Sequence, residues 1–222
     1  MMQHEPLVWA AMILPAILAI TVHEAAHGWV ANRLGDQTAM RLGRVTFNPL
    51  RHIDPLGTLL VPALTYALGG LLFGWAKPVP VDWRNLHHPR RDVALVAAAG
   101  PGVNLLMALL WALIIQAGAL ALPLSHWIGL VLVYSGVFGV LINLWLMALN
   151  LVPLLPLDGG RIIHALLPGP LARAFARLEP LGLIILLILL VTGVLGAFLQ
   201  PIVHACIGFL PSGAIVKDLV FS

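Results

Sequence analysis

Charged side chains are scarce in this sequence of 222 residues. Asp, Glu, Lys and Arg make up 9% of the chain, whereas soluble domains carry about 25%. Hydrophobic residues make up 60%, and the mean hydropathy is +0.98. So few polar groups could not cover a globular surface in water, which excludes a soluble domain, a disordered chain and a soluble nucleic-acid-binding protein. We therefore expect a protein whose surroundings are lipid.

Cysteine is almost absent, since Cys206 is the single one. One thiol can form no internal disulfide, which excludes a small disulfide-stabilised scaffold. The excess of basic charge is also small, with a net charge of +3. In a membrane protein such an excess bears on orientation, and we expect no nucleic-acid partner.

Long apolar stretches predict where the chain crosses the membrane. A helical crossing needs about 20 mainly apolar residues. Five stretches come close to this length, namely 6–32, 56–76, 93–122, 127–151 and 180–199, and a weaker apolar tail follows at 202–215. The fold class is therefore predicted to be an all-α polytopic membrane protein with four or five transmembrane helices.

Basic residues cluster in three of the polar connections between these stretches. They are Arg33, Arg41, Arg44 and Arg51 in the first, Lys77, Arg84, Arg90 and Arg91 in the second, and Arg161, Arg173 and Arg177 in the third. Only Lys217 lies elsewhere. If all three connections are cytoplasmic, the positive-inside rule holds almost completely. The first two share a side only if 56–76 does not make one full crossing.

Glycine and proline interrupt the stretch 56–76, which makes it a poor single straight helix. Irregular backbone is tolerated at membrane depth where it lines a cavity or packs on protein. We favour a re-entrant segment that enters the membrane and returns to its own side. An ordinary helix containing some glycine is the alternative.

An H-E-x-x-H motif, HEAAH, occupies residues 23–27 within the first apolar stretch. Residues four apart share one face of a helix, so His23 and His27 can both bind one zinc ion. Glu24, beside the first of them, can accept a proton from an attacking water. Ionisable residues inside a membrane span are costly and indicate function. The alternative is a polar cluster that is hydrogen-bonded between helices.

Asp158 is the best candidate for the third protein ligand that catalytic zinc sites usually have. It is the only acid between Asp92 and Glu179, and it follows an apolar helix that two prolines break. A turn in which Asp158 caps the next helix is the alternative. Asp158 and His27 lie near the same membrane face only if 56–76 returns to its own side. The ligands and the basic residues thus require the same unusual loop.

Asn104, Asn150 and His52 are weaker candidates. Either amide could donate a hydrogen bond to a developing oxyanion, or could satisfy broken backbone between helices. His52 is expected to be a loop residue, with a role in the site as the alternative.

Four motifs follow one another along the chain: HEAAH at 23–27, GWAKPVPV at 74–81, GPGVN at 100–104 and NLVPLLPLDGGR at 150–161. Together they make the sequence resemble the site-2 protease family of intramembrane zinc metalloproteases, in its compact form without a PDZ or CBS domain. The resemblance implies that His23, His27 and Asp158 bind one zinc ion per chain. It also implies that Glu24 is the general base and that Asn150 acts in the active site.

The resemblance implies one membrane-embedded protease domain over 1–222. Its core, 6–161, would include a re-entrant, β-hairpin-like region within 40–85, and 162–222 would add accessory helices. The expected activity is hydrolysis of peptide bonds within transmembrane segments of protein substrates in the bilayer. The expected location is the plasma membrane, with the active site toward the cytoplasm. The alternative function is a non-catalytic membrane protein that binds or transports a metal.

Overall fold

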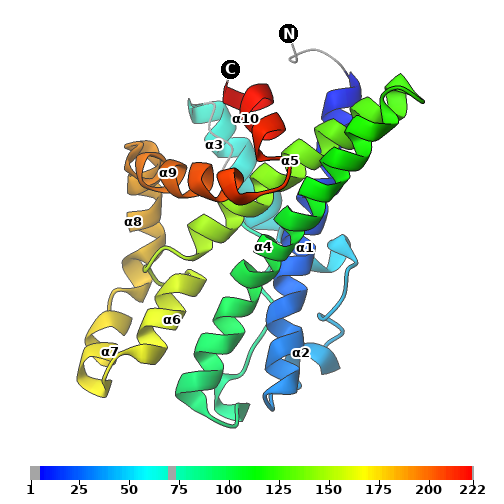
Figure 1. The fold of residues 1–222 in the computed structure, drawn as a ribbon. Coiled ribbons are helices and arrows are strands. Elements are labelled where there is room, and N and C mark those ends of the chain that lie inside the picture. Colours follow the sequence, from blue (N-terminus) through cyan, green and yellow to red (C-terminus); the bar gives the residue numbers. More distant parts are fainter. Residues whose placement is uncertain (1–5, 70–73, 222) are drawn as a thin grey trace.

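The computed structural model describes residues 6–69 and 74–221, and these are mostly helical, with no β-strand among them. The α-helices of this part are α1 (Pro6–Arg33), α2 (Thr38–Arg41), α3 (Val61–Gly69), α4 (Pro89–Ala121), α5 (His126–Asn150), α6 (Asp158–Leu166), α7 (Gly169–Ala176), α8 (Glu179–Val191), α9 (Val194–Phe209) and α10 (Gly213–Phe221). The predicted all-α fold class is confirmed (Figure 1).

Three helices of the described residues are long and apolar enough to cross a membrane. They are Ala11–Arg33 of α1, the whole of α4 and the whole of α5, which match the first, third and fourth apolar stretches. Helices α7 and α8 add a fourth if the pair, bent by 61°, counts as one span. The described residues thus supply three spans, one fewer than the lower predicted number, or four if the bent pair is counted.

The fifth apolar stretch, 180–199, is divided between two helices. Helix α8 ends at Val191, Gly193 takes a left-handed φ of +76°, and α9 begins at Val194. Glycine adopts this conformation at little cost because it has no Cβ atom. Figure 1 shows α9 turning away from the direction of α8. The prediction of one continuous helix is wrong here because mean hydropathy does not register a single left-handed residue.

Helices α1, α4 and α5 pack together at the centre of the molecule (Figure 1). Small residues let α4 and α5 approach closely, since a Cβ on Gly136 or Gly139 would overlap Ile115 or Trp111. Close backbone approach is the usual basis of helix association in lipid, where apolar burial drives little. Helix α9 then covers α5 with buried side chains that include Leu199, so the central helices are held on two sides.

The chain between α1 and α4 begins and ends at the same end of the molecule. The amide of His87, just before α4, donates a hydrogen bond to the carbonyl of Leu34, just after α1 (3.0 Å). The part of this connection that leads away from α1, residues 49–69, is called the outgoing limb. It contains a 3-10 turn (Pro49–His52), a π-helical turn (Pro55–Leu60) and α3. The returning limb, 74–82, has no regular secondary structure and lies beside the outgoing one. The predicted return of 56–76 to its own side is confirmed.

Two backbone contacts hold the limbs together. Trp75 donates from its amide to the carbonyl of Gly57 (3.0 Å), and Lys77 does the same to His52 (2.8 Å). The predicted β-hairpin-like form is wrong for the described residues, because the outgoing limb is helical and 74–82 forms no strand. Pro78 and Pro80 lack the N–H groups that a strand ladder needs. Residues 70–73, where the chain reverses, lie outside the described residues.

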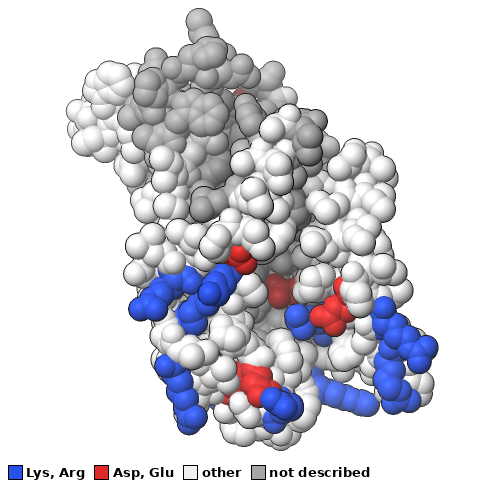
Figure 2. Space-filling model, turned by 180° about the vertical axis from the view of Figure 1, so that it is seen from behind, with Lys and Arg blue, Asp and Glu red and all other residues white. Residues whose placement is uncertain are grey.

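Basic side chains gather in the lower part of the molecule, where α1 ends and α4 begins (Figures 1 and 2). Within this region the Arg44 guanidinium donates to the carbonyl oxygen of Lys77 (3.0 Å). The first and second basic connections therefore share one end of the molecule, as the charge pattern predicts.

Candidate metal centre

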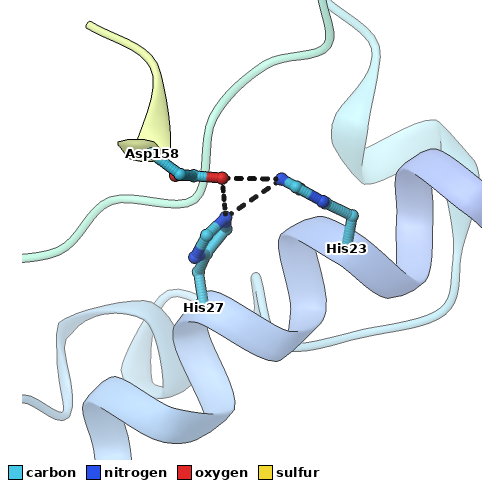
Figure 3. Close-up of side chains that lie close together, drawn as sticks. All are labelled: His23, His27 and Asp158. Carbon is cyan, nitrogen blue, oxygen red and sulfur yellow. Dashed lines mark hydrogen bonds and ion pairs between the residues drawn. The ribbon is translucent and has the colours of Figure 1, made fainter. Parts of the chain in front are cut away.

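His23 and His27 project from one face of α1, and Asp158, at the start of α6, lies opposite them (Figure 3). The Oδ2 atom of Asp158 is 3.3 Å from His23 Nε2 and 3.4 Å from His27 Nε2. The two Nε2 atoms are 3.1 Å apart. The structure thus brings together the three side chains that the sequence predicts as ligands, from two elements far apart in the chain.

All three facing atoms can act as lone-pair donors to a cation. His27 Nδ1 lies 2.8 Å from the carbonyl oxygen of Val96. A carbonyl oxygen only accepts, so this nitrogen carries the hydrogen and Nε2 is left with its lone pair. Asp158 Oδ2 is buried and has no hydrogen-bond donor within the described part of the chain.

Lone pairs held this close repel one another unless a cation lies among them. Two imidazole nitrogens and one carboxylate oxygen are the ligand set of many catalytic zinc sites. These are the residues of the described chain that form a group able to hold a metal ion. The cluster therefore fits zinc.

Gly100 of α4 faces the two imidazoles directly. A Cβ atom there would stand 2.5 Å from His23 Cε1 and 2.5 Å from His27 Nε2. Such distances do not occur between real side chains, so any other residue would displace the ligands. Glycine at this position leaves room for a metal ion against α4.

Gly159 and Gly160 let the start of α6 pack closely against the chain that follows α5, which places Asp158 beside the two histidines. Neither has a positive φ, so neither is needed here for a left-handed backbone. A Cβ on either would overlap the backbone of Leu151 or Leu154. Asp158 makes no capping hydrogen bond, and the N-cap of α6 is Leu157, so the capping alternative is not what the structure shows.

Glu24 is half-buried and lies under the returning limb. Its Oε2 atom accepts a hydrogen bond from the amide of Val79 (2.8 Å). Gly28 permits this approach, since a Cβ there would come 3.0 Å from Val79 Cγ1. Val79 of the returning limb is thus held against the turn of α1 that carries the motif.

The remaining candidates lie differently. Asn150 donates from Nδ2 to the carbonyl of Leu146 in its own helix (3.0 Å), so its role in the active site stays a prediction. His52 is buried, and its Nε2 lies 3.0 Å from the carbonyl oxygen of Thr46. Asn104 directs its side-chain oxygen at His23 Nδ1.

Asn143 of α5 was not among the sequence candidates. It is fully buried and hydrogen-bonded to Asn104 (2.9 Å). The signal that could have found it is a lone amide within an otherwise apolar span.

Several bacterial proteins are similar to this chain over most of its length. A Bacillus subtilis protein named "Putative zinc metalloprotease YwhC" is 37% identical over 202 residues, which cover 87% of this chain and 86% of the relative. "Putative zinc metalloprotease Rip2" of Mycolicibacterium smegmatis is 30% identical over 200 residues, or 89% and 73% of the two chains. Rip2 of Mycobacterium tuberculosis is 30% identical over 205 residues, or 90% and 75%. No family model matches the chain, and no solved structure does.

Proposed function

This chain belongs to the site-2 protease family of zinc metalloproteases, and from that premise we propose that it cleaves peptide bonds within transmembrane segments of other membrane proteins. The observation that carries the proposal is the convergence of His23, His27 and Asp158 inside a bundle of membrane-length helices. A hydrolytic site at this depth meets its substrates within the bilayer.

In the proposed enzyme His23, His27 and Asp158 would hold one zinc ion per chain. Zinc supplies Lewis-acid activation of water and of the scissile carbonyl group. Glu24 accepts the proton of the attacking water at its carboxylate and delivers it to the leaving amine. Because Glu24 follows His23 in sequence, the general base and the two histidine ligands come from the same stretch of α1, whereas Asp158 comes from α6. Asn150 is proposed to assist at the developing oxyanion.

The substrate is proposed to be a transmembrane helix that is locally unwound. All backbone groups of such a helix are bonded internally, so a segment must open before its carbonyl can be attacked. The segment 74–82, whose Val79 amide is bonded to Glu24, is proposed to lie beside the unwound peptide. Substrates with helix-weakening residues near the cut should therefore be preferred.

The plasma membrane is the proposed location, with the basic end of the molecule in the cytoplasm. The gathering of Lys and Arg at that end supports this orientation (Figure 2). Water would then reach the metal centre from the cytoplasmic side.

The test combines zinc analysis with cleavage of a model transmembrane peptide by the purified, reconstituted protein. Glu24→Gln should keep its zinc and lose cleavage, because the amide cannot accept the proton. Asp158→Ala should lower zinc content, because one of three ligands is gone. Normal turnover by Glu24→Gln, or full zinc occupancy in Asp158→Ala, would contradict these roles. A wild-type protein that binds zinc but cleaves no transmembrane peptide would favour a metal-binding or transport protein.

A further inference from the structure

A line of buried amides runs from α5 through α4 to the first metal-facing histidine. Asn143 Nδ2 donates to the carbonyl oxygen of Gly139 (2.8 Å), and Asn104 Nδ2 donates to Asn143 Oδ1 (2.9 Å). Asn104 Oδ1 in turn faces His23 Nδ1. Asn143 and Asn104 are 0% and 1% exposed, so water does not compete for these bonds.

The donor and acceptor of each hydrogen bond can be assigned by starting from the carbonyl oxygen of Gly139. The carbonyl oxygen of Gly139 can only accept, so Asn143 must present its NH₂ group there and its oxygen to Asn104. Asn104 must then use its NH₂ group toward Asn143, which leaves its oxygen for His23. An oxygen facing an imidazole nitrogen requires that nitrogen to carry the hydrogen. His23 therefore has its hydrogen on Nδ1 and its lone pair on Nε2.

The reversed arrangement is disfavoured because it leaves buried groups without partners. If Asn143 were flipped, two oxygens would face each other at Gly139. If Asn104 alone were flipped, its NH₂ group would face His23 Nδ1 and force the hydrogen onto Nε2. An unmet buried polar group costs about 1–3 kcal/mol, which is enough to fix one arrangement.

We infer that Asn104 and Asn143 are positioning residues that keep the lone pair of His23 on Nε2, where it faces His27 and Asp158. The inference rests on the metal centre of the proposed function and adds two residues to it. For His27, the carbonyl oxygen of Val96 alone keeps the hydrogen on Nδ1 and the lone pair on Nε2. The Nδ1 atom of His23 instead faces Asn104 of α4. Asn143 of α5 holds the Asn104 amide in the orientation that presents its oxygen to His23.

Partners of this kind typically change metal affinity by about 10- to 100-fold when they are removed. Asn143→Leu keeps the size of the side chain but removes the bond that orients Asn104. Asn143 touches no metal ligand itself, yet zinc affinity, measured by chelator competition, should fall about tenfold or more. The visible spectrum of the cobalt-substituted protein should change with it. If Asn143→Leu does not fold, the same measurements are made on Asn143→Ala.

Two further variants separate positioning from packing. Asn104→Asp keeps an acceptor beside His23 Nδ1 but gives up the donor to Asn143, so it should bind zinc less tightly than the wild type and more tightly than Asn104→Leu. Ser135→Ala is the matched control, because Ser135 is a buried α5 residue that donates to Ala11 of α1 (3.0 Å) without touching the amides. Its zinc affinity should stay at the wild-type value.

Wild-type zinc affinity in folded Asn143→Leu would overturn the inference, as would an equal loss in Ser135→Ala. These readouts depend on zinc alone. Failure of the inference is therefore distinguishable from failure of the proposed proteolysis, which appears as zinc-loaded wild-type protein without cleavage.

Discussion

Gly100 sets how closely α4 approaches the two imidazoles of α1. Its missing side chain leaves the space in which a metal ion meets His23 and His27. The metal centre thus depends on one residue that has no functional group at all.

Gly100→Ala is expected to lower zinc affinity by about 10- to 100-fold, because overpacking costs about 1–3 kcal/mol and here falls on the ligands themselves. Chelator competition on the purified protein measures this. Gly102→Ala is the control, since a Cβ on Gly102 meets nothing within 4 Å. Equal affinities for the two variants would mean that α4 does not confine the centre.

Single residues of the centre were predictable to different degrees. His23, Glu24 and His27 follow from a helical spacing, and Asp158 from being the only acid in a long stretch. Gly100 was noted only as part of the GPGVN motif, and Asn143 not at all, because their importance lies in distances between helices that hydropathy and spacing do not contain.

Asp36 joins elements at the basic end of the molecule. Its Oδ1 atom accepts from Thr38 and from the side chain of Asn85 (3.0 Å), and its Oδ2 atom accepts from the amide of Asp82 (2.9 Å). Asp36 is fully buried. These bonds tie the end of α1 to the chain that leads back from the returning limb, and so help to hold Val79 over Glu24.

The pKa of Asp36 lies below its ordinary value of 3.8. Burial by itself raises it, and the donors from Asn85, Thr38 and Asp82 together outweigh that effect. A lowered pKa in the folded state means that the ionised carboxylate stabilises the fold above pH 3.8. This contribution is lost as the pH falls through the lower, folded-state value.

Asp36→Asn is therefore expected to lower the free energy of unfolding by about 1–3 kcal/mol at neutral pH, because an NH₂ group replaces one of two accepting oxygens. Thermal unfolding in detergent measures the difference, which should shrink in strong acid. Asp54→Asn is the control, because asparagine caps the turn at Pro55–Leu60 as well as aspartate does. A difference that persists unchanged in strong acid would contradict the assigned bonds.

Whole helices were predictable where apolar runs are long and unbroken, as in α4 and α5. The outgoing limb and the α8–α9 turn were not, because short apolar runs suit a helix or a strand equally and one glycine can end either. The return of 56–76 to its own side was predictable from the basic residues that flank it, although not from hydropathy.

For the molecule as a whole, the end that carries α6, α7 and the basic connections should face one side of the membrane. The turn after α4, which includes Leu124, should face the other. Leu124 is 89% exposed, and so is the side chain of Arg84.

Single cysteines at Arg51, Arg84 and Leu124 test this in a Cys206→Ala background. An impermeant thiol reagent should label Arg51→Cys and Arg84→Cys from the same side, and Leu124→Cys from the opposite side. Labelling of Arg51→Cys and Arg84→Cys from opposite sides would require 56–76 to cross the membrane once.

The break at Gly193 has a consequence for the surrounding lipid. Helix α8 has 13 residues, which span about 20 Å, whereas the hydrocarbon layer is about 30 Å thick. Its outward side chains, such as Ile184 and Ile188, are exposed, so acyl chains meet them directly. If α8 alone spans the hydrocarbon layer, hydrophobic mismatch would thin the bilayer beside it, whereas α4, with 33 residues or about 50 Å, is longer than the layer is thick. The lipid around the protein is then expected to be thinner beside α8 than beside α4.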